Sequence, residues 1–130
     1  MTLQVRDIIK YQGEKKELFE GDALEPLLTK IKIPPFYPPD TSNWRGYTCN
    51  WEIMENKLYL VKFKGYLENN KKVDLSFLFD NKKKVFANWY SGELTLLNED
   101  KIYFNSFFDN DDTISLKVKQ GIIVKPKLRN

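Results

Sequence analysis

Hydrophobic and polar positions alternate most clearly between residues 44 and 64, where the pattern predicts a β-hairpin. In its first strand, polar residues separate the members of one apolar face, which are Tyr47, Cys49, Trp51 and Ile53. A turn at Glu55-Asn56 leads to a second strand, residues 58–63, which is apolar on both faces over its first half. Such a strand is typical of the middle of a closed or double-layered sheet. We therefore predict that this hairpin forms the centre of the fold.

Two further hairpins are predicted near the ends of the chain. Residues 5–19 contain two strands around Gly13, and residues 113–125 alternate around a turn at Gln120-Gly121. Short helical turns are predicted after Asp22 and Asp74, since aspartate is a common N-cap, although a strand fits residues 74–79 almost as well.

The stretch between the central hairpin and Asp74, residues 65–72, is polar and predicts a turn or loop. Residues 85–97 begin in a bend and become a strand. About eight strand candidates and one or two helical turns predict one mainly-β domain, residues 1–130. Its expected architecture is a small antiparallel barrel or sandwich.

Residues 33–43 are the one break in composition, because two Pro-Pro pairs flank Phe36 and Tyr37. Consecutive prolines predict a stiff, exposed loop that leads into Trp44. The loop could be a proline-rich ligand for a groove on another protein, or a crossover that covers one end of a barrel. The second role is the commoner one for connecting segments.

Length and charge narrow the class of protein. A chain of 130 residues with 42% hydrophobic residues is sufficient for one folded core. Its 21 basic and 18 acidic residues are spread evenly, so composition alone does not predict binding to nucleic acid. The N-terminus lacks the apolar run of a signal peptide and no stretch is long enough for a membrane-spanning helix, so we expect a cytoplasmic protein.

The absence of histidine excludes histidine-dependent triads and histidine-ligated zinc sites. The single cysteine, Cys49, forms no internal disulfide and is predicted to be a small buried residue rather than a nucleophile. Residues 109–112 are acidic but lack the spacing of a calcium loop, and no glycine-rich phosphate-binding motif is present. We expect no metal and no cofactor.

Two chemical alternatives remain. Glu52 and Glu93 would serve a small carboxylate-dependent hydrolase if both lay in one cleft. The triplet Lys82–Lys84, with aromatic residues nearby, would bind single-stranded nucleic acid or a phosphate weakly.

Aromatic residues also precede two predicted strands, at Trp44-Arg45 and at Trp89-Tyr90. If these strand entrances share one end of a barrel, they predict a ligand site that comprises Phe36, Tyr37, Trp44, Arg45, Trp89, Tyr90 and Glu93. The alternative is that Trp44 and Trp89 plug the core and that Arg45 pairs with Glu52 or Glu93.

Several sequence blocks together resemble a family of small bacterial proteins of unassigned function. The resemblance covers roughly residues 5–125 and is carried by Trp44-Arg45-Gly46-Tyr47, Trp51-Glu52-Ile53, Leu58-Tyr59-Leu60 and the block from Val85 to Leu94 that includes Trp89 and Ser91-Gly92-Glu93. It implies a bacterial single-domain protein and carries over no activity. Our leading hypothesis is a non-enzymatic intracellular module that binds a protein or small ligand, of the immunity or accessory type.

Overall fold

The computed structural model describes residues 6–40, 42–43, 45–79, 83–98 and 113–127. Trp44, Lys82 and the acidic segment 109–112 therefore lie outside the described residues. The described chain forms nine strands, two short α-helices and one 3-10 turn. In chain order these are β1 (Ile8–Tyr11), β2 (Glu14–Glu20), α1 (Glu25–Leu28), β3 (Tyr47–Met54), β4 (Lys57–Leu67), η1 (Glu68–Asn70), β5 (Lys71–Asp74), α2 (Leu75–Leu78), β6 (Val85–Phe86), β7 (Gly92–Asn98), β8 (Thr113–Lys119) and β9 (Ile122–Lys127).

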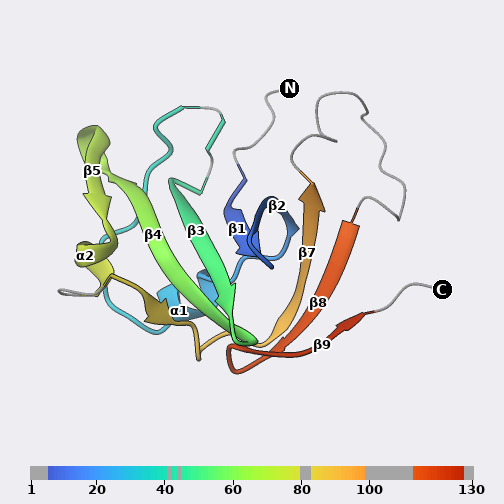
Figure 1. Cartoon of the computed structure of the whole chain (residues 1–130). Helices are drawn as coiled ribbons and strands as arrows, with labels where there is room; N and C mark the ends of the chain where they lie inside the picture. Colours follow the sequence, from blue (N-terminus) through green and yellow to red (C-terminus); the bar gives the residue numbers. More distant parts are fainter. Residues whose placement is uncertain (1–5, 41, 44, 80–82, 99–112, 128–130) are drawn as a thin grey trace.

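Seven of the strands close into a barrel (Figure 1). Neighbouring strands follow the order β3-β1-β2-β7-β8-β9-β4, and pairing of β4 with β3 completes the circle. The pairs are antiparallel except for β1 with β3, which run parallel. β5 and β6 are additional strands on β4. The predicted mainly-β class is thus confirmed, and the architecture is the barrel.

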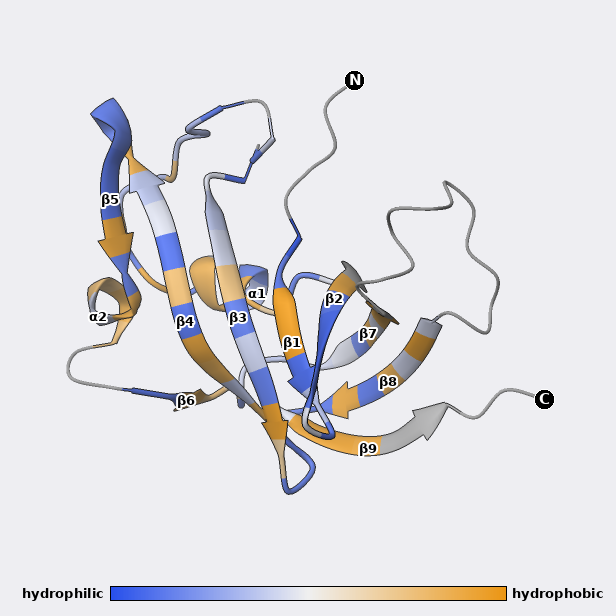
Figure 2. Ribbon diagram, turned by 45° about the horizontal axis from the view of Figure 1, so that its top comes forward, coloured by the Kyte–Doolittle hydropathy of each residue, from blue (hydrophilic) through white to orange (hydrophobic). Residues whose placement is uncertain are grey.

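The barrel core is built by the alternation of inward and outward side chains. Figure 2 shows the matching alternation of hydrophobic and hydrophilic residues along β4 and β8. Tyr47, Cys49 and Trp51 of β3 are buried, as their pattern predicts. They meet fully buried leucines of β4, β7 and β8, while Ala23 and Leu24, just before α1, add to the same cluster. The helical turn itself begins where Asp22 Oδ1 accepts hydrogen bonds from the backbone N–H groups of Leu24 and Glu25.

A β-bulge in β4 explains why its sequence is apolar on both faces. Asn50 pairs with Lys62 but Trp51 pairs with Leu60, so Val61 is an extra residue. Even-numbered residues therefore face inward up to Leu60, and odd-numbered residues face inward from Phe63; both of these side chains are buried. Lys62 and Lys64 consequently lie on the outer face, where each is exposed. Without the extra residue these two lysines would face the core.

The prediction of a loop over residues 65–72 is wrong. β4 continues to Leu67, and β5 returns along it in a register from Lys64↔Asp74 to Leu67↔Lys71. The reversal at η1 uses Asn69 and Asn70 in the left-handed region, a conformation that asparagine tolerates. The helical interpretation of the next segment is confirmed, because Asp74 caps α2 by accepting a hydrogen bond from the Ser76 backbone N–H.

Candidate functional site

Arg45 joins two carboxylates at one end of the barrel. Its Nη2 lies 2.7 Å from Asp7 Oδ1 and its Nη1 lies 3.1 Å from Asp22 Oδ2. The guanidinium carbon also lies 4.5 Å from the centroid of the Tyr47 ring, a cation–π arrangement. The expected pairing of Arg45 with Glu52 or Glu93 is therefore wrong. Asp7 and Asp22 are closer because the turn that precedes α1 and the start of β1 both reach the first residues of β3.

The other hydrogen bonds of this network leave its carboxylates satisfied. Asp7 is 3% exposed and also accepts hydrogen bonds from the Cys49 backbone N–H at 2.9 Å and Trp51 Nε1 at 3.2 Å. Asp22 Oδ2 accepts a hydrogen bond from the Tyr47 hydroxyl at 2.6 Å. A buried carboxylate that is held by an arginine and further donors is the arrangement that burial of a charge requires.

Two acidic side chains of the network, Tyr47 and Cys49, stay protonated near neutral pH. Burial, and then the hydrogen bond to Asp22, raise the pKa of Tyr47. Burial, and then the nearby Asp7 carboxylate, raise the pKa of Cys49 well above its ordinary value. Burial lowers the pKa of Arg45, but the charges of Asp7 and Asp22 outweigh it, so the pKa is raised. Near neutral pH this cluster holds neither a thiolate nor a phenolate, and its role is to join β1, β3 and α1.

The described residues of the predicted aromatic site have different surroundings. Phe36 is half-buried against the rings of Tyr47 and Phe63, at centroid distances of 5.5 Å, whereas the adjacent Tyr37 is 44% exposed. The proline loop is thus held against the barrel by one of its two aromatic residues. Trp44 lies outside the described residues, so its role stays a prediction.

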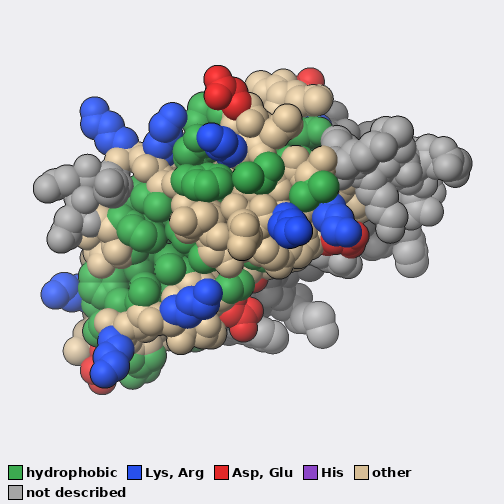
Figure 3. Space-filling view, turned by 90° about the horizontal axis from the view of Figure 1, so that it is seen from below, with side chains coloured by type: hydrophobic (Ala, Val, Ile, Leu, Met, Phe, Trp, Pro, Cys, Tyr) green, Lys and Arg blue, Asp and Glu red, His purple; other side chains and the backbone are tan. Residues whose placement is uncertain are grey.

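Trp89 and Tyr90 connect elements near the α1 end of the barrel. Trp89 stacks on Phe79 at 5.8 Å, and its Nε1 donates to the Ala23 carbonyl at 2.7 Å. Tyr90 is buried and donates its hydroxyl to the backbone carbonyl of Glu93. Figure 3 shows hydrophobic side chains gathered on part of the lower face, bordered by Lys and Arg side chains. We infer that both aromatic residues mainly anchor this end of the barrel.

The structure does not bring Glu52 and Glu93 together. Glu52 lies on β3 between Lys10 and Tyr59 of the neighbouring strands, and Glu93 lies on β7 opposite Lys117. Two strands, β1 and β2, separate β3 from β7 in the barrel wall. These glutamates therefore share no cleft of the kind that paired-carboxylate hydrolysis uses.

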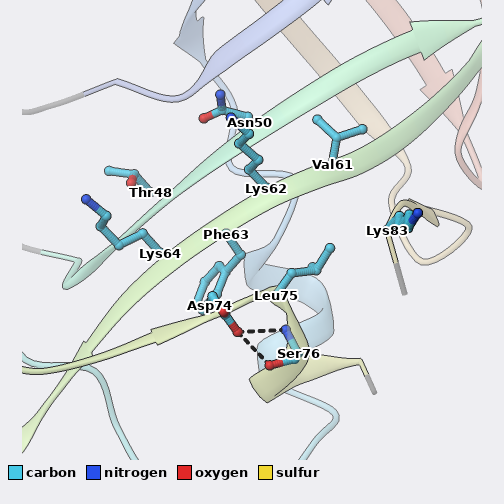
Figure 4. A pocket seen from close by; sticks show the side chains of 10 residues that line it. All are labelled: Thr48, Asn50, Val61, Lys62, Phe63, Lys64, Asp74, Leu75, Ser76 and Lys83. Carbon is cyan, nitrogen blue, oxygen red and sulfur yellow. Dashed lines mark hydrogen bonds between the residues drawn. The ribbon is translucent and has the colours of Figure 1, made fainter. Parts of the chain in front are cut away.

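A concave surface of the described residues lies along β4 (Figure 4). A pocket of about 640 Å³ is lined by Thr48, Asn50, Val61, Lys62, Phe63, Lys64, Asp74, Leu75, Ser76 and Lys83. A second pocket of about 430 Å³ shares four of these residues and extends to Lys72, Val73 and Phe77. We call the two pockets together the β4 groove. None of the six described residues of the predicted aromatic site lines it.

The β4 groove is strongly basic. Its exposed lysines are Lys62, Lys64, Lys72 and Lys83, and none of them forms an ion pair with another described residue. The one carboxylate among its described lining residues, Asp74, accepts hydrogen bonds from Ser76 N at 3.1 Å and Ser76 Oγ at 2.6 Å. The Ser76 hydroxyl, and then its backbone N–H, lower the pKa of Asp74. Four lysines and one aspartate give the described lining of the groove a net charge of +3.

Strand pairing assembles this charge from one lysine-rich part of the sequence. Lys62 and Lys64 face outward because of the bulge, β5 brings Lys72, and the segment before β6 brings Lys83. Residues 62–84 contain seven lysines and three acidic residues, a local excess that the balanced totals of the two halves of the chain conceal. The part of this signal that the sequence analysis used is the lysine triplet, of which Lys83 lines the groove.

Lys84 has a different position from Lys83. Its Nζ lies 4.9 Å from the Tyr59 ring centroid, and Lys57 Nζ lies 5.8 Å from that of Phe86. The two rings are neighbours, with centroids 5.9 Å apart. The chain's own lysines thus cover aromatic faces on which a nucleic-acid base would stack.

Comparisons with protein-family models, with curated proteins and with solved structures found no match to this chain. Among the described residues, no group of three or more Cys, Asp and Glu side chains is arranged to hold a metal ion. The helices formed by the described residues are too short to cross a membrane.

Proposed function

We propose that this protein is a non-enzymatic binding module whose β4 groove holds an acidic segment of a partner protein. The observation that carries the proposal is the set of four exposed lysines around a groove in which the one described carboxylate, Asp74, is already hydrogen-bonded. An acidic segment supplies the counter-charges that these lysines lack among the described residues. A small bacterial protein that neutralises or accompanies an intracellular partner would use such a groove.

The lining of the groove favours a peptide over single-stranded nucleic acid. Phe63 is 5% exposed and Leu75 is 8% exposed, so the groove has an apolar floor. The one other described ring in its lining, Phe77, is partly buried and in edge contact with Phe36, so a row of stacked bases would find a single ring. Nearby, the faces of Tyr59 and Phe86 are covered by lysines. Side chains of a peptide, by contrast, can place carboxylates beside the lysines and apolar groups over the floor.

A binding experiment with a synthetic probe tests this function. The probe is a fluorescein-labelled peptide of alternating glutamate and valine, and its control has glutamine in place of glutamate. Fluorescence anisotropy at low ionic strength should show tighter binding of the acidic peptide. The double variant Lys62→Glu/Lys64→Glu should weaken binding at least about tenfold, because it reverses two charges in the groove.

A matched pair of lysines on another part of the barrel provides the control. Lys117 and Lys119 are exposed on β8, and the variant Lys117→Glu/Lys119→Glu makes the same change of net charge away from the groove. This variant should bind the probe nearly as well as the unaltered protein. If both variants lost the same affinity for the probe, the loss would be explained by the net charge of the protein alone, and the proposal would be overturned. Tighter binding of oligothymidylate than of the acidic peptide would replace it with the nucleic-acid function.

A further inference from the structure

The lining of the β4 groove includes two polar side chains of β3 that lie beside its lysines (Figure 4). Thr48 of β3 pairs with Lys64 of β4. Two residues further along β3, Asn50 pairs with Lys62. Residues that oppose each other in an antiparallel pair project to the same face, with Cβ atoms about 4.5–5.5 Å apart. We call these pairs the Thr48–Lys64 row and the Asn50–Lys62 row, and each combines one ammonium group with one uncharged hydrogen-bonding group.

The uncharged groups of both rows are available to a ligand. Thr48 and Asn50 are half-buried, and neither side chain forms a hydrogen bond with another described residue. A threonine hydroxyl supplies one hydrogen-bond donor, and an asparagine amide supplies two. A carboxylate that lies in a row can therefore accept a hydrogen bond from the uncharged donor and contact the lysine ammonium group at the same time.

The position of β3 in the barrel fixes the spacing between the two rows. β3 pairs with β1 on one side and with β4 on the other, and Asn50 lies opposite Ile8 of β1. The side chains of Thr48 and Asn50 are short, so their donors stay close to this paired backbone, whereas lysine has a flexible four-carbon stem. Two residues along an antiparallel strand span about 6.8 Å. The β3 side chains therefore set the distance between two bound carboxylates, and the lysines adjust to it.

We infer that the groove selects an acidic segment that is extended and has carboxylates two residues apart, with one carboxylate in each row. This inference rests on the proposed function and names the residues that select the partner. In an extended chain, residues i and i+2 project to the same side at about 6.8 Å, which is the spacing of the rows. A Glu-x-Glu segment therefore places each carboxylate between a β3 donor and a β4 lysine. Thr48 and Asn50 determine the specificity, and Lys62 and Lys64 supply the charge.

Two probes of identical composition test the spacing. The first is the alternating glutamate–valine peptide, in which successive glutamates are two residues apart. The second repeats Glu-Glu-Val-Val over the same length, so no two of its glutamates are two residues apart, and on a helix it presents glutamates at i and i+4. Fluorescence anisotropy should show at least about fivefold tighter binding of the alternating probe, because the extended isomer can fill only one row at a time. Equal or tighter binding of the isomer would overturn the inference.

Two variants that leave every charge in place test the β3 side chains. Thr48→Val and Asn50→Leu each remove an uncharged donor and keep a similar side-chain volume. Each should weaken binding of the alternating probe at least about threefold and reduce its preference over the isomer. Thr95 of β7 is also half-buried and does not line the groove, so Thr95→Val is the matched control and should leave both affinities unchanged. Urea titration of each variant confirms that folded proteins are compared.

The outcomes separate this inference from the proposed function. Unchanged binding by both β3 variants would overturn the inference. If the double variant Lys62→Glu/Lys64→Glu still weakened binding in that case, the proposed function would stand, and the groove would recognise charge alone. If neither probe bound the unaltered protein, the inference and the proposed function would both be overturned.

Discussion

Asp7 is a charged residue in an apolar stretch of sequence, and its carboxylate is held by donors from β3. Arg45, the Cys49 amide and the Trp51 indole all donate to it. The chain separation between Asp7 and these donors is about forty residues, so no local motif announces the contact. The only sequence signal is a charge that interrupts the strand pattern just before Ile8. At the residue scale, sequence therefore predicted the buried face of β3 but not the polar group that it surrounds.

Substitution of Asp7→Ala should strongly destabilise the protein. It leaves a buried backbone N–H and a buried indole N–H without an acceptor and removes one of the two counter-charges of Arg45. Each unsatisfied donor costs about 1–3 kcal/mol, and loss of one partner of a buried ion pair costs about 3–5 kcal/mol. The free energy of unfolding should fall by about 3 kcal/mol or more, as measured by urea titration.

A carboxylate on the barrel surface is the control for Asp7. Glu93 is exposed on β7, and Glu93→Ala should change the free energy of unfolding by no more than about 0.5 kcal/mol. Similar small losses for both variants would show that the Asp7 network contributes little net stability.

At the scale of elements, two hairpin turns of similar conformation differ in their surroundings. Gly13 and Gly121 have φ angles of +79° and +81°, and each follows a glutamine that also has positive φ. A Cβ atom at Gly13 would meet no atom within 4 Å. A Cβ atom at Gly121 would lie 2.6 Å from the Ala87 carbonyl oxygen. The second turn is therefore held against the segment after β6.

Alanine at these glycines should separate backbone strain from steric clash. Gly13→Ala should cost about 1–2 kcal/mol, since it places a side chain in the left-handed region. Gly121→Ala bears the same strain and must also displace the Ala87 carbonyl, so it should cost at least about 1 kcal/mol more. Chemical denaturation of the two variants measures the difference. Equal losses would mean that the second turn can move away from Ala87.

The sequence predicts the elements whose hydrophobic positions alternate regularly, and it does not predict those that are defined by hydrogen bonding to another strand. The three hairpins follow from alternation and from turn residues such as Gly13, and both helical turns follow their aspartates. β5 was missed because its side chains are largely exposed and show no alternation. The bulge at Val61 was missed because register is a property of two strands. The β4 groove depends on both features and so could not be predicted.

For the whole molecule, the length of β4 determines where the β4 groove lies. Its eleven residues exceed the combined span of the strands on its outer edge, and the groove with its four lysines lies between β5 and β6. Barrel closure otherwise removes strand edges. A chain of small net charge thus folds with a basic groove among its described residues. The inward residues determine the fold, and the interrupted pairing of one strand creates the candidate site.

Global stability should decline in alkaline solution because three buried acids, Cys49, Tyr47 and Tyr90, have raised pKa values in the folded protein. The ordinary values are 9.0 for the thiol and 10.0 for the two phenols. Above those values the unfolded chain releases protons that the folded chain retains, so rising pH favours unfolding. The free energy of unfolding should begin to fall near pH 9 and fall more steeply above pH 10. Each group contributes a slope of at most about 1.4 kcal/mol per pH unit.

Denaturation under reducing conditions from pH 7 to pH 10.5 measures this decline, and two variants assign it. Cys49→Ala should flatten the profile between pH 9 and pH 10, and Tyr47→Phe should flatten it above pH 10. Each substitution also lowers stability at neutral pH, so the slopes rather than the absolute values are compared. A Cys49→Ala slope equal to that of the unaltered protein would contradict the assignment to the thiol. Cys49 lies in the core, and Tyr47 donates a hydrogen bond to Asp22, which also binds Arg45. If each variant flattens the profile in its own pH range, ionisation of these two side chains beside the Arg45 network contributes to the loss of barrel stability in alkaline solution.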